Sequence, residues 1–174
     1  MMTARYLIDT TVFMKFQHGQ EYDKSCFPTH FKNFLKLLDD GIAVSIDKVK
    51  EELSDDFFCE EYDDIFKDSI DNEISSTYND LRKKFPEYFE QRTLDNPDDA
   101  DIYLVTYAYH NDLCIVTQDE FQSIRRDYNI PALCDLLEGV CVDNKENKEN
   151  AGMFDGGFGC ICLTELIRVE NLMR

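Results

Sequence analysis

The chain contains 174 residues, of which 43% are hydrophobic and 31% are charged, as is typical of a globular protein with one domain. Acidic residues outnumber basic residues by 36 to 18, for a formal net charge of −18, which excludes binding of nucleic acid through a broadly basic surface. The sequence has neither a run of about 18 apolar residues nor a secretory signal. We therefore expect a cytoplasmic protein that is not embedded in a membrane.

Strands and helices are predicted to alternate in the first third of the chain. Residues 4–8 and 42–46 are short apolar runs that predict buried strands. Between them, Pro28 opens a helix with apolar residues at helical spacing, and Gly41 ends it. Asp47 stands at the N-cap position of the next helix. This order is the beginning of a β-α-β-α pattern.

The middle of the chain is predicted to be mainly helical. Residues 55–92 hold apolar and aromatic residues at mixed helical spacings, which predicts two or three helices, without a strand, that cap or flank the domain. The segment DNPDD, residues 95–99, breaks this pattern and caps a helix over 100–110. LCIVT, residues 113–117, then predicts another buried strand.

The last part of the chain predicts two more helices and one strand. A short helix begins near Pro131, and GVCVD, residues 139–143, is the last predicted strand. The polar, glycine-rich residues 143–159 predict a mobile loop or insertion, and a final helix is expected over 163–173. We interpret residues 1–174 as a single α/β domain, a three-layer α/β/α fold around a mainly parallel sheet.

Acidic residues follow two of the predicted strands. Asp9 comes directly after the first strand, and Asp119 follows strand 113–117. Glu52 lies in the first turns of the helix after strand 42–46, and Asp101 lies in the first turn of helix 100–110. Because ligand sites of parallel sheets form outside the carboxyl ends of the strands, these acids can gather at one edge. Four carboxylates there require cations, and oxygen ligands favour Mg²⁺ or Mn²⁺. Such an ion activates water toward a phosphodiester.

Four segments in this order resemble the acidic motifs of the PIN-domain ribonucleases: LIDTTVF, SIDKVKEEL, DADIYLVTYA and IVTQD. The segments IVTQDE and NIPALC are similar to those of a PIN-like subfamily of toxin–antitoxin-type proteins, in which VTQE precedes IP-x-x-C. The resemblance covers about residues 4–142. It implies a PIN-like fold and a metal-dependent endoribonuclease that leaves a 3′-hydroxyl and a 5′-phosphate.

The resemblance also implies roles for individual residues. The catalytic metal ligands would be a quartet of acids, and two hydroxyls would support them: Asp9, Glu52, Asp101 and Asp119, with Thr10 and Thr117. The family often has asparagine or serine at the position of Thr11. Two alternatives stay open. Glu51 replaces Glu52 if the helix register shifts by one residue, and Glu120 can replace Asp119, since relatives carry either aspartate or glutamate at this point of the motif.

Other interpretations of these residues are less favoured. A first strand that ends in Asp9 is also similar to the haloacid-dehalogenase phosphatases, but those have a second acid two residues later, where this chain has Thr11. A zinc site formed by cysteines lacks the C-x(2–4)-C pairs that structural zinc sites favour. Each acid taken singly is also compatible with a helix cap or a solvated surface.

The expected partners follow from this hypothesis. The substrate would be single-stranded or structured RNA, and four basic residues near the acids are candidate phosphate contacts: Lys48, Lys50, Arg125 and Arg126. If the protein is the toxin of a toxin–antitoxin pair, an antitoxin protein neutralises it, and a homodimer is a further expectation. The alternative is a non-catalytic PIN-like module whose acidic helices, residues 55–73, bind a basic protein.

Overall fold

The computed structural model describes residues 4–17, 19–53, 57–95, 99–119, 129–142 and 156–172, with the side chains of 91–95 excepted. Within these residues the chain forms one six-stranded sheet with the strand order β3-β2-β1-β4-β6-β5. Every neighbouring pair of strands is parallel. The strands are β1 (Tyr6–Ile8), β2 (Ala43–Ile46), β3 (Phe66–Lys67), β4 (Cys114–Val116), β5 (Val140–Val142) and β6 (Gly159–Ile161).

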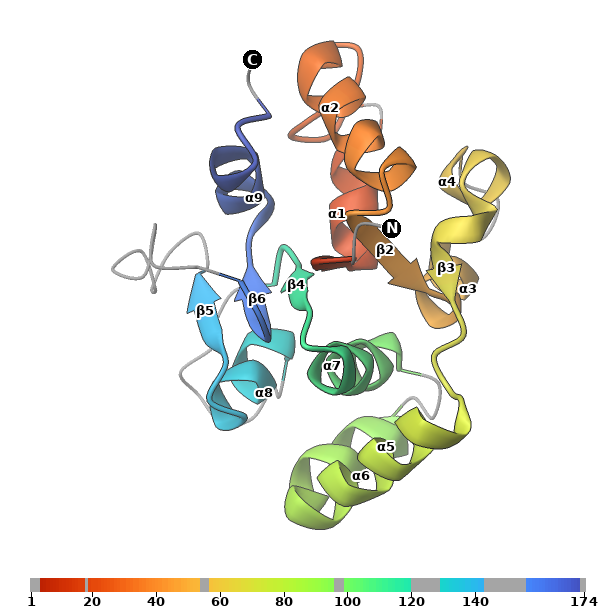
Figure 1. Cartoon of the computed structure of the whole chain (residues 1–174), viewed down its shortest axis with the longest axis vertical. Helices are drawn as coiled ribbons and strands as arrows, with labels where there is room; N and C mark the ends of the chain where they lie inside the picture. Colours follow the sequence, from red (N-terminus) through yellow and green to blue (C-terminus); the bar gives the residue numbers. More distant parts are fainter. Residues whose placement is uncertain are drawn as a thin grey trace.

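Helices cover both faces of the sheet (Figure 1). One face carries α1 (Thr10–Lys15), α2 (Pro28–Asp39) and α9 (Leu163–Val169), and the other carries α7 (Ala100–Asn111) and α8 (Ile130–Leu136). The remaining helices are α3 (Asp47–Leu53), α4 (Phe57–Glu61), the 3₁₀ turn η1 (Asp63–Ile65), α5 (Asn72–Lys84) and α6 (Pro86–Asp95). This arrangement confirms the predicted α/β class, with three α/β/α layers and a parallel sheet.

The core explains why the strands have continuous apolar sequences. All three residues of β1 and all three of β4 are buried, because a parallel sheet with helices on both faces has no solvated side. Pro28 occupies the first turn of α2, where its missing N–H costs no hydrogen bond, and Gly41 follows the helix with a φ of +66°. The helices α5 and α6 lie outside α7 (Figure 1).

Three elements differ from the sequence-based prediction. Residues 143–159 were expected to form a loop, yet Gly159–Ile161 forms β6, which lies inside the sheet between β4 and β5. Residues 143–155 of that expected loop lie outside the described part. A short strand, β3, interrupts the segment 55–92, which was expected to be purely helical. Finally, α1 begins at Thr10, with only Asp9 between it and β1, where the sequence predicts no helix.

None of the helices in the described part of the chain is both long enough and apolar enough to span a lipid bilayer.

Candidate functional site

The candidate site lies where the order of the strands reverses. The chain proceeds from β1 to β2 and β3 on one side of the sheet, whereas β4 pairs with the opposite edge of β1. In open α/β sheets the crevice at such a switch point, outside the carboxyl ends of the strands, is where ligands bind. Asp9 follows β1 directly, and its backbone N–H still donates to the carbonyl of Val116 in β4 at 3.0 Å. Its side chain therefore starts from the switch point.

The Asp9 carboxylate is held by two hydroxyls that come from opposite sides. Thr11, in the first turn of α1, donates to Asp9 Oδ2 at 2.5 Å. Thr117, directly after β4, donates to the same oxygen at 2.8 Å. Asp9 Oδ1 accepts no hydrogen bond from the described residues. One carboxylate oxygen is thus fixed by the protein, while the other is left for a further partner.

Burial and neighbouring charge raise the pKa of Asp9. The carboxylate, only 3% exposed, has its pKa raised from 3.8 to about 6, chiefly because burial penalises the charged form. The negative charges of Asp119 and Glu52 raise the pKa further, whereas the hydrogen bonds from Thr11 and Thr117 lower it. Glu52 and Asp119 are therefore close enough to Asp9 for their charges to act on it.

A hydroxyl from α1 also fixes the orientation of Glu52. Thr10 Oγ1 donates to Glu52 Oε2 at 2.5 Å, which joins the start of α1 to α3. Glu51, the alternative ligand, instead forms an ion pair with Lys48 at 3.0 Å on the surface of α3. The structure thus turns Glu52, rather than Glu51, toward the first turn of α1.

The two remaining acids are positioned by the backbone around them. The N–H of Asp119 donates to Thr117 Oγ1 at 3.0 Å, so the threonine that holds Asp9 also fixes the segment that carries Asp119. Asp101 lies half-buried in the first turn of α7, and its N–H donates to the capping carboxylate of Asp99 at 3.0 Å. The alternative ligand Glu120 lies outside the described residues.

The oxygen atoms of the site suit a hard cation. Carboxylates and hydroxyls are the ligands that Mg²⁺ and Mn²⁺ prefer, and the unbonded Oδ1 of Asp9 leaves one such ligand available. Among the described residues, no three carboxylate, imidazole or thiol side chains stand close enough together to hold a metal ion. Glu52, whose charge acts on Asp9, has its Oε2 held by the Thr10 hydroxyl.

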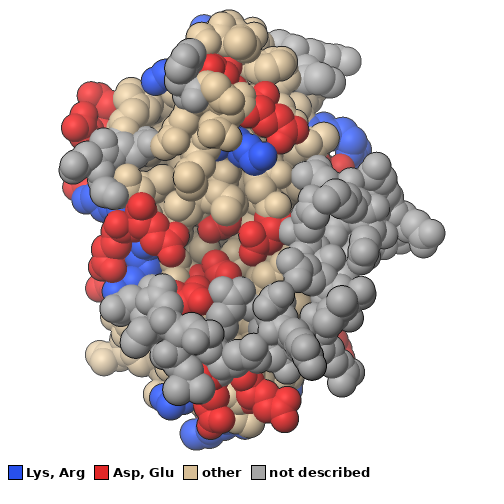
Figure 2. Space-filling view, turned by 180° about the vertical axis from the view of Figure 1, so that it is seen from behind, with Lys and Arg blue, Asp and Glu red and all other residues tan. Residues whose placement is uncertain are grey.

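The basic residues predicted to contact RNA have different surroundings. Lys50 forms an ion pair with Asp63 of η1, just before β3. Lys48 is paired with Glu51, and its ammonium also lies 5.8 Å from the ring centroid of Tyr103 in α7. Arg125 and Arg126 lie outside the described residues. Figure 2 shows one face of the molecule, on which acidic side chains form several groups and basic side chains lie in small separate groups.

Two residues of the site were not predicted to support it. Thr11 donates to Asp9 and accepts the backbone N–H of Gln118 at 3.1 Å, so it ties β1 to the segment after β4. Ser45, fully buried in β2, donates to the carbonyl of Ile8 at 2.7 Å, just before Asp9. A polar residue inside the apolar run IAVSI was the available signal for Ser45.

Comparison with known proteins gives one match. A family model described as "Domain of unknown function (DUF4411)" matches residues 6–153 of the chain. No curated protein and no solved structure matches it. The matched range contains all four predicted acids together with β1 to β5.

Proposed function

The chain belongs to the DUF4411 family, whose description assigns no activity, and we propose from its own residues that it is a PIN-like, metal-dependent endoribonuclease. The observation that carries this proposal is the state of Asp9. A buried carboxylate at the switch point has a raised pKa, two hydroxyl donors on one oxygen, and a second oxygen that accepts no hydrogen bond from the described residues. A divalent cation bound there would neutralise the negative charge of this buried carboxylate.

The residues that would hold Mg²⁺ or Mn²⁺ are the four acids of the predicted quartet: Asp9, Glu52, Asp101 and Asp119. A bound cation of this kind lowers the pKa of a coordinated water and neutralises charge on a phosphodiester. Thr11 and Thr117 keep Asp9 in one rotamer, and Thr10 keeps Glu52 near it. Such supporting hydrogen bonds typically change metal affinity or activity by about 10- to 100-fold.

The substrate in this proposal is RNA, single-stranded or structured, which reaches the site despite the acidic surface because cations reverse the local charge. Resemblance to toxin–antitoxin-type proteins supports a role as a toxin, with an antitoxin protein as its partner. A homodimer and a cytoplasmic location belong to the same proposal.

Cleavage of a fluorescently labelled, single-stranded RNA tests this activity. We expect the wild-type protein to cut the RNA with Mn²⁺, to leave 5′-phosphate ends, and to be inactive in EDTA. Asp9→Asn should reduce cutting to the level seen in EDTA, because the amide is a poor ligand for the cation. Asp40→Asn is the matched control, since this exposed residue at the end of α2 is followed by the amino end of β2, at the opposite edge of the sheet. Equal activity of wild type and Asp9→Asn would refute the assignment.

A second candidate function is a module that binds a basic protein. It is favoured by a pocket of about 270 Å³ beside α4 and η1, whose lining combines apolar and acidic side chains: Leu38, Asp39, Phe57, Glu61, Tyr62 and Asp64. Phe57 is 38% exposed there, so a basic segment with an apolar side chain would find both kinds of contact. This function requires no metal, and a protein that gains no stability from Mn²⁺ and cuts no RNA would favour it.

A further inference from the structure

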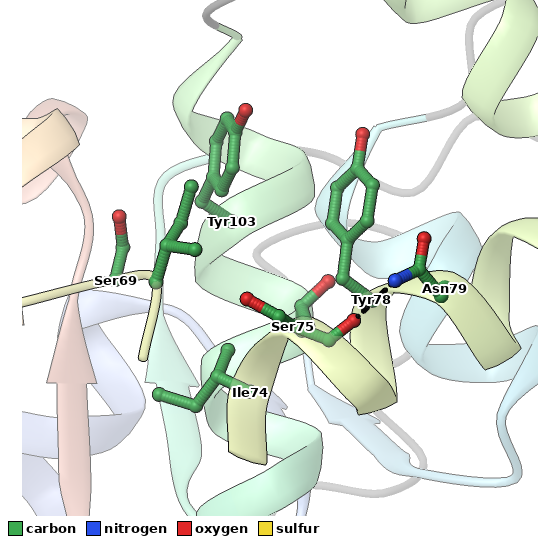
Figure 3. Close-up of a pocket in the computed structure, with 8 residues that line it drawn as sticks. Ser69, Ile74, Ser75, Tyr78, Asn79 and Tyr103 are labelled. Atoms are coloured by element: carbon green, nitrogen blue, oxygen red, sulfur yellow. Dashed lines mark hydrogen bonds between the residues drawn. The ribbon is translucent and has the colours of Figure 1, made fainter. Parts of the chain in front are cut away.

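A second pocket lies between α5, α7 and the segment after β3 (Figure 3). Its volume is about 240 Å³, below the roughly 300–1,000 Å³ of pockets for drug-sized ligands. Ile70, which is 49% exposed, and the exposed Asn79 form part of its rim, so the pocket opens to solvent. The remaining lining residues are Ser69, Ile74, Ser75, Tyr78, Tyr103 and Thr106.

Two parallel tyrosine rings form the aromatic wall of this pocket. Tyr78 of α5 and Tyr103 of α7 stack with their centroids 5.8 Å apart and their planes at 17°. Figure 3 shows both rings pointing the same way from their two helices. Tyr78 also makes an edge-to-face contact with Phe89, with the ring centroids 5.3 Å apart, and this contact restricts the orientation of the Tyr78 ring. The wall is therefore preformed, so a planar ligand can stack without first ordering these side chains.

A polar group without a partner completes the lining. Ser69 is 1% exposed, and its hydroxyl makes no hydrogen bond to the described residues. Such an unsatisfied buried group is rare and calls for an explanation. A ligand that carries donors and acceptors on the edge of a flat ring would satisfy it.

The pocket is connected to the acidic site through α3. The backbone N–H of Ser69 donates to Asp47, the first residue of α3, at 3.2 Å. Lys48, the next residue, places its ammonium 5.8 Å from the Tyr103 ring centroid. Lys48 precedes Glu52 by four residues, about one helical turn, so both residues lie on the same face of α3. An anionic group attached to the ligand would meet Lys48 beside Tyr103.

We propose that this pocket binds one nucleobase of an RNA substrate, stacked on Tyr103 and Tyr78, with the attached phosphate at Lys48. The inference rests on the proposed ribonuclease function and names a subsite for it. A nucleotide offers a flat base that can stack on the tyrosine rings and donors and acceptors on the edge of that base that can bond to the Ser69 hydroxyl. Its phosphate supplies the negative charge that Lys48 attracts. Stacking tolerates every base, so the subsite would position RNA with little sequence preference.

Titration with the four ribonucleoside 5′-monophosphates in EDTA, followed by nuclear magnetic resonance, tests the pocket separately from catalysis. We expect the methyl signals of Ile70 and Ile74 to shift and saturate, because ring currents of a stacked base act on them. Tyr103→Ala should weaken binding by about 5- to 150-fold, the range known for base stacking on aromatic side chains. Tyr103→Phe should retain binding.

Two further variants serve as controls. Ile70→Asp places a carboxylate at the exposed rim without removing buried packing, so it should keep the fold and still weaken binding. Tyr109→Ala removes a tyrosine of α7, the helix that also carries Tyr103. Tyr109 is 41% exposed and does not line the pocket, so this variant should bind the nucleotides like wild type. Loss of binding in Tyr109→Ala to the same extent as in Tyr103→Ala would contradict the assignment of the pocket.

Cleavage of single-stranded RNA with Mn²⁺ distinguishes the two hypotheses. If both hold, Tyr103→Ala raises KM and leaves kcat nearly unchanged, because stacking acts on substrate binding. Nucleotide binding in the pocket of a protein that cuts no RNA would support the subsite and refute the ribonuclease. Cleavage with no methyl shifts and an unchanged KM in Tyr103→Ala would overturn the subsite alone and would favour a protein segment as occupant of the pocket.

Discussion

At the scale of single residues, the ionised carboxylate of Asp9 lowers the stability of the folded protein when no cation is bound. Its carboxylate is buried and stands near two other negative charges, so the folded protein binds a proton at Asp9 more tightly than the unfolded chain does. Two threonine hydroxyls offset part of this cost. A buried charge that a protein keeps at such a cost is a candidate for function.

The raised pKa predicts how stability depends on pH in EDTA. The folded-state pKa of Asp9 is about 6, against an ordinary value of 3.8 for an aspartate. The stabilising contribution of the protonated group is therefore fully present below about pH 4 and is lost as the pH rises through about 6. The free energy of unfolding falls by about 3 kcal/mol in total over this range. Asp9→Asn has no proton to lose. We expect the variant to gain stability relative to wild type as the pH rises.

Urea denaturation of both proteins between about pH 4 and pH 8 measures this difference. Other acids shape both curves, so the wild-type free energy of unfolding minus that of Asp9→Asn isolates the residue. Asp40→Asn should follow the wild-type curve, because Asp40 is exposed. Parallel curves for wild type and Asp9→Asn would show that Asp9 does not titrate in this range.

The sequence allowed the positions of the acids to be predicted better than their contacts. That Asp9 and Asp119 follow strands could be foreseen, because short apolar runs end just before them. The contacts of Glu52 with Thr10 and of Glu51 with Lys48 could not be foreseen. Adjacent residues of a helix point in directions about 100° apart, and the sequence left the helix register uncertain by one residue. The role of Thr11 depends on a contact with Gln118, which lies 107 positions away.

At the scale of elements, β6 is the main difference between prediction and structure. The strand has only three residues and begins with Gly159, which is unfavourable in strands, so local propensity gave little signal. Its place between β4 and β5 depends on long-range pairing that no local pattern contains. By contrast, β1, β2 and β4 were predictable because a buried parallel strand requires a continuous apolar run.

Close packing of β5 and β6 predicts that Gly159 is irreplaceable. A Cβ atom at Gly159 would lie 2.3 Å from the carbonyl oxygen of Val140, a backbone atom that side-chain rotation cannot move. We expect Gly159→Ala to lower the free energy of unfolding by about 3 kcal/mol, the upper end of the usual cost of overpacking. Chemical denaturation measures the loss.

Val140→Thr is the control for this strand pair. Val140 pairs with Gly159 but is 38% exposed, so a threonine of similar shape should change stability by no more than about 0.5 kcal/mol. A variant Gly159→Ala as stable as Val140→Thr would mean that β5 and β6 do not pair in the register described.

At the scale of the whole molecule, the net charge of −18 sets the proposed enzyme apart from basic nucleases. Proteins that hold RNA or DNA through many lysines and arginines lose affinity steeply with salt, because binding releases counterions. Of the four basic residues predicted to contact RNA, the two that the structure describes, Lys48 and Lys50, each form an ion pair with an acid. RNA would therefore depend mainly on divalent cations and on stacking, with Lys48 as a single phosphate contact.

This charge balance predicts a weak dependence of cleavage on monovalent salt. Between about 50 and 200 mM NaCl, at saturating Mn²⁺, we expect kcat/KM to change by less than about threefold, whereas six to ten phosphate contacts would cost about 10³ to 10⁵ in affinity. Initial rates at low RNA concentration give the value directly. A steep fall would indicate that a basic surface, rather than the acidic site, binds the RNA.

The most direct test of a cation site at Asp9 is a thermal melt with and without millimolar Mn²⁺, on wild type, Asp9→Asn and Asp40→Asn. A cation that binds only the folded state stabilises it by about 2.7 kcal/mol at 100 times its Kd, which corresponds to a rise in Tm of about 5–10 °C for a domain of this size. A cation site centred on Asp9 requires this rise in wild type and Asp40→Asn and none in Asp9→Asn. No rise in wild type, or an equal rise in all three proteins, would contradict a cation site centred on Asp9.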